Sequence, residues 1–277
     1  MFRCFCLCIQ LLTGCNTLLS GQEYIFQVAD YGMEEGLSHT DVQSIHQDRE
    51  GFLWIGTNYG LNRFDGYRFK WFTQEKHGLQ ANAVNHILED DQGWLWLVNT
   101  GFRSSREVKT IDIFNPATEQ VVSFEKKFKT KLPFAATDIN SFCASDEGRL
   151  AFVTKQKKLW VYSSADGFEV HDLGIYSLSV ETFSKHQTIW CHASKTDDKL
   201  RDLIVEIDLK GKVVHRYEHE FPFQHNFIAG IDKGDNLWYL SRNWEHKTDI
   251  STILIRVSRI GSRLNKPPPK ALTILVV

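Results

Sequence analysis

The sequence predicts an all-β fold from three observations. Aromatic residues make up 13% of the 277 residues, with 8 Trp and 19 Phe against 6 Pro and 2 Met, and aromatic and β-branched side chains favour pleated sheet. The motif Asp-x-x-Gly-x-Leu-Trp recurs along the chain. Short apolar segments bounded by turn residues surround each copy, which is the pattern of antiparallel strands.

The composition is that of a folded protein without a strongly charged field. Apolar residues make up 42% and charged residues 24% of the chain, which excludes wholesale disorder. The net charge is −2, so we expect no nucleic-acid partner.

Residues 1–20 predict an export signal. Arg3 precedes an apolar stretch from Cys4 to Leu12, which is too short to span a bilayer. Two processing sites compete in this segment. Residues 12–15 resemble a bacterial lipobox, in which Cys15 is lipidated, whereas Ser20 suits an ordinary signal peptidase. We therefore expect an exported, periplasmic protein whose contact with the membrane is at most a lipid on Cys15.

The motif has two sharp copies and three weaker ones. Asp48–Trp54 and Asp90–Trp96 fit it fully, and the weaker anchors are Ala151, Trp190 and Trp238. In each turn we expect Asp to cap its own backbone, Gly to supply a left-handed angle, and Trp to pack in the core. The residues given these structural roles are Asp48, Gly51, Trp54, Asp90, Gly93, Trp96, Trp190, Asp232 and Trp238.

Each anchor is preceded by one predicted strand and followed by further ones. The third strands are residues 61–65, 110–115, 159–163, 204–208 and 254–258, and the fourth are 67–72, 120–124, 168–172 and 212–217. Four short antiparallel strands in a repeat of about 45 residues are typical of a β-propeller blade. A β-sandwich is the alternative. We expect a partial β-propeller of about five four-stranded blades.

The last blade is predicted to be incomplete. Pro267, Pro268 and Pro269 follow the fifth repeat and cannot donate to a strand ladder. Tyr24–Val28 is an extra strand before the first repeat, of the kind that closes a propeller ring. The expected domains are an export signal at 1–20, propeller repeats at 21–262 and an irregular tail at 263–277 that is not part of the fold.

The first repeat resembles the two-component regulator propeller repeat. Gly36-Leu37-Ser38 leads through Asp48 and Gly51 to Leu53–Thr57 and then Gly60–Gly66, almost position for position. Such repeats are typical of the periplasmic sensor of Bacteroidetes-type hybrid histidine kinases. That resemblance implies a dimeric receptor that senses oligosaccharides. We expect a sensor portion truncated before any kinase.

Loops between the second and third strands are the predicted ligand site. Loops of this kind converge at the mouth of a propeller channel, and their aromatic, amide and guanidinium groups suit a sugar ring. The candidates are Asn58, Tyr59, Asn99, Arg103, Arg242, Asn243 and Trp244. The basic run 125–131 is predicted to be a solvated surface.

The sequence indicates binding without catalysis, metal or cofactor. His39, His46, His77 and His86 share no ligand spacing, and we interpret them as solvated loop residues. Cys143 and Cys191 are expected to be buried free thiols, with a disulfide left open. The predicted function is therefore an oligosaccharide-sensing module. The alternatives are a propeller lyase or glycan-active enzyme, a free-standing glycan-binding protein and a pure scaffold.

Overall fold

The computed structural model describes residues 29–101, 107–128, 132–174, 176–195, 203–217, 225–242, 252–257 and 275–276. The chain divides into a unit at Met1–Tyr31 and a unit at Gly32–Val277. All strands of the described residues lie in the second unit. The predicted strand at 24–28 and the export signal fall outside the described residues.

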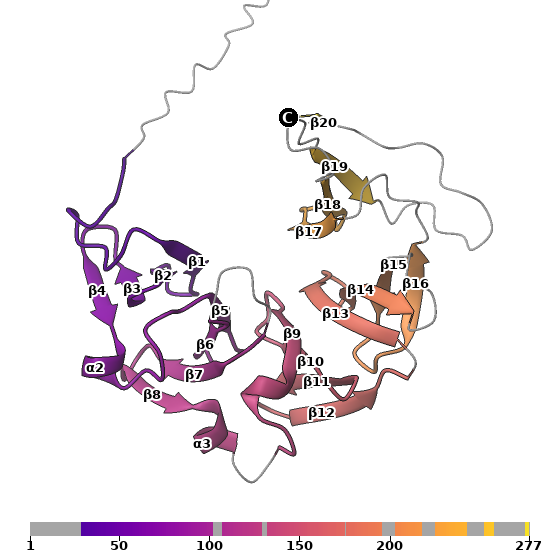
Figure 1. Cartoon of the computed structure of the whole chain (residues 1–277), viewed down its shortest axis with the longest axis horizontal. Helices are drawn as coiled ribbons and strands as arrows, with labels where there is room; N and C mark the ends of the chain where they lie inside the picture. Colours follow the sequence, from indigo (N-terminus) through magenta and orange to yellow (C-terminus); the bar gives the residue numbers. More distant parts are fainter. Residues whose placement is uncertain are drawn as a thin grey trace, which may run out of the picture. The chain divides into compact units, whose positions relative to one another are not determined.

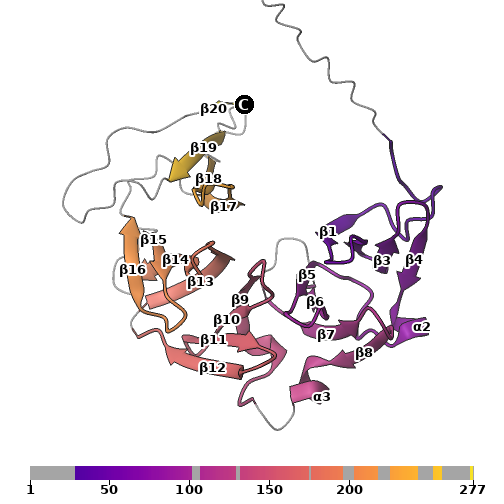
Figure 2. The same ribbon diagram turned by 180° about the vertical axis from the view of Figure 1, so that it is seen from behind.

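Twenty strands of the described chain form five antiparallel sheets of four. Figure 1 shows the sheets following one another in chain order, and Figure 2 shows them from behind. The first sheet has β1 (Val42–Gln47), β2 (Leu53–Thr57), β3 (Gly60–Phe64) and β4 (Phe69–Phe72). The second has β5 (His86–Glu89), β6 (Leu95–Asn99), β7 (Thr110–Asn115) and β8 (Gln120–Ser123).

The remaining sheets keep the same order of strands. The third has β9 (Ile139–Ala144), β10 (Leu150–Thr154), β11 (Lys158–Ser163) and β12 (Gly167–Asp172). The fourth has β13 (Tyr176–Phe183), β14 (Ile189–Lys195), β15 (Leu203–Ile207) and β16 (Val213–Tyr217). The fifth has β17 (His225–Ile231), β18 (Leu237–Arg242), β19 (Thr252–Val257) and β20 (Leu275–Val276).

The sheets are blades of a β-propeller, which confirms the predicted fold class. Each blade is a meander in which consecutive strands pair. The first strands of successive sheets contact one another, β1 with β5, β5 with β9, β9 with β13 and β13 with β17. A β-sandwich has no such series of neighbouring first strands.

The last blade differs from the sequence expectation. A fourth strand was not predicted there, but β20 pairs antiparallel with β19, with Ile253 opposite Val276 and Leu254 opposite Leu275. This strand is only two residues long. The prediction considered the prolines at 267–269 and not the apolar residues beyond them, which pair with the sheet edge.

Apolar side chains between neighbouring blades form the core. Trp54, Trp96 and Trp190 are fully buried, as predicted for wedges between blades, whereas Trp238 is only half-buried. Trp54 packs edge-on against Phe114 of β7, with ring centroids 5.4 Å apart. Cys143 and Cys191 are buried free thiols in the core between the third and fourth sheets.

Short helices lie in the connections between the first three blades. They are α2 (Gln74–His77), α3 (Phe124–Phe128) and the 3-10 helix η1 (Ala136–Asp138). The strand predicted at 120–124 ends at Ser123, because α3 begins at Phe124 and buries Phe124 and Phe128. Lys127 lies with its Nζ 3.5 Å from the centre of the Trp94 ring. The interpretation of 125–131 as a purely solvated surface is therefore wrong at Lys127 and Phe128.

Candidate functional site

Asp48 organises the turn between β1 and β2 through both carboxylate oxygens. Its Oδ1 accepts the backbone N–H groups of Glu50 at 3.0 Å and Phe52 at 2.9 Å. Its Oδ2 accepts the indole N–H of Trp54 at 2.6 Å. The same side chain therefore closes the turn and satisfies the polar atom of a fully buried core residue.

The other Asp copies repeat this geometry. Asp90 and Asp232 each cap their own turn and accept the indole N–H of Trp96 and Trp238, both at 3.0 Å. Hydrogen bonds from the Asn236 backbone and the Trp238 indole hold the pKa of the Asp232 carboxyl well below its usual range. The sequence predicted the backbone cap but missed the bond to tryptophan, although the constant spacing of six residues was a signal for it.

Serine replaces aspartate in the third and fourth blades. Ser145 Oγ accepts the backbone N–H of Arg149 at 3.0 Å, and Ser184 Oγ accepts that of His186 at 3.1 Å. A hydroxyl still closes the turn because it keeps one acceptor at the right place. Every blade of the described chain thus has a capped five-residue turn, at residues 48–52, 90–94, 145–149, 184–188 and 232–236.

Neighbouring turns are joined to one another. Arg49 donates to the carbonyl oxygens of Asp90 and Asp91, both at 2.8 Å. Gly148 lies so close to the second turn that a Cβ there would come within 2.3 Å of the Asp91 nitrogen. We call this series of contacts between turns 48–52, 90–94, 145–149, 184–188 and 232–236 the turn belt.

The turn belt continues into the last two blades. Gln187 donates to Glu147 Oε2 at 2.8 Å, which joins the fourth turn to the third. The backbone N–H of Lys185 donates to Asp235 Oδ1 at 2.9 Å, which joins the fourth turn to the fifth. Contacts between turns therefore link all five blades in order at one end of their strands.

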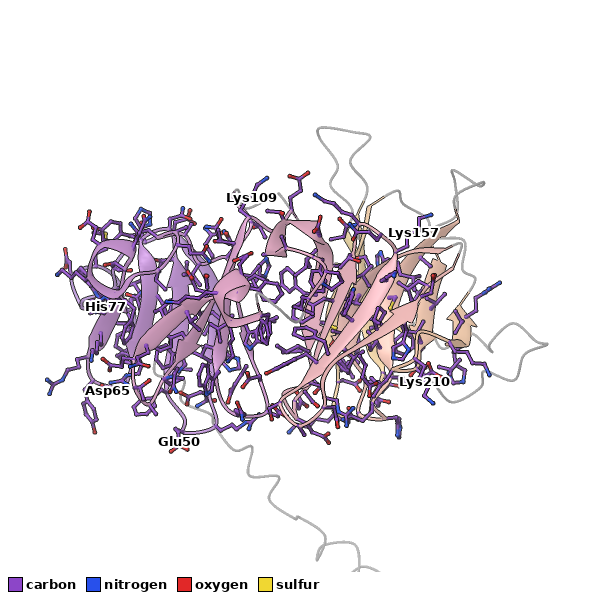
Figure 3. All side chains as sticks on the ribbon, turned by 90° about the horizontal axis from the view of Figure 1, so that it is seen from below. Glu50, Asp65, His77, Lys109, Lys157 and Lys210 are labelled. Carbon is purple, nitrogen blue, oxygen red and sulfur yellow. The ribbon has the colours of Figure 1, made fainter. Side chains whose placement is uncertain are left out.

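The two ends of the strands differ. Figure 3 shows Glu50 and Lys210 at one side of the molecule, and Lys109 and Lys157 at the opposite side. The turns between first and second strands are all five residues long, whereas connections between second and third strands run from residues 58–59 in the first blade to 100–109 in the second and 243–251 in the fifth. We call this second end the loop end.

A cavity of about 320 Å³ lies in the turn belt where the first three blades meet. Its walls come from the end of β1 and its turn, from β5, and from the end of β9 and its turn. The lining residues are His46, Gln47, Asp48, Arg49, Ile87, Leu88, Glu89, Ala144, Ser145, Asp146 and Gly148. None of them was predicted as a ligand residue, because no short sequence spacing joins them.

Glu89 is the central charged group of this cavity. Its side chain is 10% exposed. Its Oε2 lies 2.7 Å from Nε2 of His46, and its Oε1 lies 3.2 Å from Nε of Arg49. A buried carboxylate needs such partners because burial disfavours an unpaired charge. The interpretation of His46 as a solvated loop histidine is wrong, since it belongs to β1 and bonds to the next blade.

The predicted ligand residues at the loop end fall into three groups. Tyr59 is 42% exposed, and Asn58 is exposed with its Nδ2 2.5 Å from Asp41 Oδ2. Asn99 is buried, and it donates to the Ala83 carbonyl at 2.7 Å and accepts the N–H of Gly101 at 3.0 Å. Asn99 thus holds the backbone around it rather than facing solvent.

The other predicted residues lie at the edge of the described ranges or outside them. Arg242 ends β18, where its backbone pairs with His225 and Thr252. Arg103, Asn243 and Trp244 lie outside the described residues, as does the lipidation candidate Cys15. Within the described ranges, no group of three His, Cys, Asp or Glu side chains is arranged to hold a metal ion. No helix there is long and apolar enough to cross a membrane.

Comparison with known proteins gives the class to which this architecture is similar. Residues 36–59 and 78–101 match the two component regulator propeller family. Over 52 residues the chain is 44% identical to histidine kinase P4 of Formosa agariphila, a match that covers 19% of this chain and 4% of the kinase. The first two blades therefore contain repeats of the two-component regulator type.

Solved structures agree on the fold. The extracellular domain of a protein described as the hybrid two component system BT3049 of B. thetaiotaomicron superposes with a TM-score of 0.56 at 18% identity, covering 82% of this chain and 34% of that one. Virginiamycin B lyase of Staphylococcus aureus superposes with a TM-score of 0.53 at 11% identity, covering 80% and 78%. The chain thus resembles the propeller of two-component sensors and spans about a third of that extracellular domain.

Proposed function

We propose that the chain is the extracytoplasmic ligand-sensing module of a two-component signalling receptor, and that its ligand is an oligosaccharide. One observation carries the location of the site, namely the difference between the two ends of the blades. The turns between first and second strands are all five residues long and contact one another, whereas the connections between second and third strands vary in length and composition. Binding residues concentrate on variable loops held by a rigid scaffold.

Tyr59 is the side chain at the loop end that best suits a sugar. Its ring is 42% exposed, and aromatic rings present a large apolar face with a polar edge. Arg103, Arg242, Asn243 and Trp244 remain proposed ligand residues of the loop end. The module recognises its ligand without chemistry, so neither a metal nor a cofactor takes part.

Signal transmission in this proposal is a shift of population. A ligand changes the state of a receptor only through a difference in affinity between two arrangements. We propose that the arrangements are those of a homodimer of the intact receptor. The module is exported to the periplasm, and Cys15 carries its lipid if the lipobox is processed.

Binding of soluble oligosaccharides tests the loop end. We expect the chain to bind at least one member of a panel of plant and algal oligosaccharides in calorimetry. Tyr59→Ala should weaken binding about tenfold, because one stacked aromatic ring contributes about 1 kcal/mol or more. Tyr67→Ala is the matched control, since Tyr67 is a more exposed tyrosine of the same blade outside the loop end. Equal losses in both variants, or no binding by the folded chain, would contradict the proposal.

A further inference from the structure

We propose that the cavity in the turn belt is a binding site for one small neutral polyhydroxylated molecule, a monosaccharide or a cyclic polyol. This site lies at the opposite end of the strands from the loop end and does not depend on the residues proposed there. Its walls come from three blades, so a molecule within it contacts β1, β5 and β9 or their turns at the same time.

The size of the cavity selects a single ring. Its volume is about 320 Å³, at the lower limit of about 300–1,000 Å³ for small-molecule sites. A longer chain of sugars extends beyond these walls. The cavity therefore suits one compact molecule or one terminal unit.

Paired charges inside the cavity favour a neutral ligand. Glu89 is bonded to both His46 and Arg49. The terminal nitrogens of Arg49 donate to the backbone carbonyls of Asp90 and Asp91. A charged ligand entering here gains no buried counter-charge, yet it still bears the cost of leaving water.

The remaining groups match hydroxyls and a carbon skeleton. Asp146 is exposed at the rim and offers a carboxylate to hydroxyl donors. Ser145 accepts the N–H of Arg149, which leaves its hydroxyl hydrogen to donate. Ile87 and Ala144 supply an apolar wall. A pyranose or inositol ring presents both kinds of surface, with hydroxyls at its edge and C–H groups on its faces.

The walls of the cavity are held before any ligand arrives. Arg49 is fixed by contacts to the second turn, and Gly148 lies against the backbone of the same turn. Little side-chain freedom is then lost on binding, which favours affinity. A bound ring adds contacts between blades that the turn belt already joins.

Calorimetric titration of the whole chain tests the proposal with D-glucose, D-galactose, D-mannose, D-xylose and myo-inositol. Probes up to about 10 mM reveal even a millimolar dissociation constant. We expect at least one to bind. Ala144→Trp fills the cavity and should abolish binding, and Asp146→Asn should weaken it about tenfold because a charged acceptor is lost.

Glu50→Gln is the matched control, because Glu50 is an exposed carboxylate of the first turn that does not line the cavity. It should leave binding unchanged. Asp146→Asn changes a rim residue and keeps the test valid if Ala144→Trp does not fold.

The site would be overturned by no binding of any probe by the folded chain or by binding that survives both cavity variants. Binding of D-glucosamine or D-glucuronate more than tenfold tighter than that of every neutral probe would overturn it as well. Monosaccharide binding that Tyr59→Ala abolishes and Ala144→Trp preserves assigns the ligand to the loop end and also overturns it. Failure of oligosaccharide binding at the loop end leaves these measurements unaffected, so the two proposals are separable.

Discussion

One aspartate in each sharp repeat links a surface turn to the core. Asp48 accepts two backbone N–H groups on one oxygen and the indole of Trp54 on the other. Because Trp54 is fully buried, loss of its acceptor leaves a polar N–H without a partner away from water. Asp48 therefore contributes more to the free energy of unfolding than an ordinary turn cap does.

Replacing this aspartate should destabilise the chain strongly. We expect Asp48→Ala to lower the free energy of unfolding by about 2–4 kcal/mol, because a buried donor loses its partner and the turn loses its cap. Urea denaturation measures the change. Asp65→Ala is the control, since the carboxylate of Asp65 accepts the backbone N–H groups of Tyr67 and Arg68 in an exposed turn, and this variant should cost less. A loss at Asp48 no larger than that at Asp65 would show that the indole bond adds nothing.

At the scale of the element, glycines at equivalent turn positions have different structural roles. Gly51 and Gly148 have φ of 91° and 82°, so both occupy the left-handed region that favours glycine. Added bulk at Gly51 meets nothing within 4 Å, whereas at Gly148 it meets the backbone of the second turn. The first glycine serves only its turn, and the second also sets the spacing between blades.

A matched pair of alanine variants separates the role in the turn from the role in spacing the blades. Gly51→Ala should cost about 1 kcal/mol, the ordinary penalty for a side chain in this conformation. Gly148→Ala should cost about 3 kcal/mol or more, because the backbone of Asp90 and Asp91 must move away. Thermal unfolding of both variants measures the difference. Similar midpoints for the two would mean that the second and third turns are not in close contact.

Sequence periodicity predicted the parts of the molecule that repeat. The anchors and the strands around them follow from alternation and turn chemistry, so the blades, the buried tryptophans and Asp48 were predictable. Glu89 and the cavity were not, because their partners lie in other repeats and no local pattern records contacts between blades. The short strand β20 was missed for the opposite reason, since the local proline run outweighed two apolar residues that pair at long range.

At the scale of the whole molecule, the interface between the third and fourth blades buries two thiols. Cys143 and Cys191 belong to the same apolar core cluster. Burial raises the pKa of both thiols well above their usual value. Because the thiolate is the reactive form, an intact interface keeps both residues inert, and their reactivity reports whether these blades are together.

Thiol labelling should follow unfolding and not pH. In a variant with Cys4, Cys6, Cys8 and Cys15 replaced by serine, we expect negligible labelling of the folded chain from pH 7 to pH 9. Two thiols should become labelled in urea. Because the pKa of both buried thiols is raised, a change from pH 7 to pH 9 produces little thiolate while the core is closed. Rapid labelling of the folded chain, or a disulfide found by mass spectrometry, would contradict the free buried thiols.

The turn belt has a consequence for how such chains evolve. Each of the five turns contacts the turns next to it, and each uses the same five-residue length. A duplicated repeat therefore arrives with its own means of joining its neighbours, and no distant residue has to change with it. The five turns keep their length while the connections at the opposite end are free to diversify, so new specificities can arise by duplication without redesign of the scaffold.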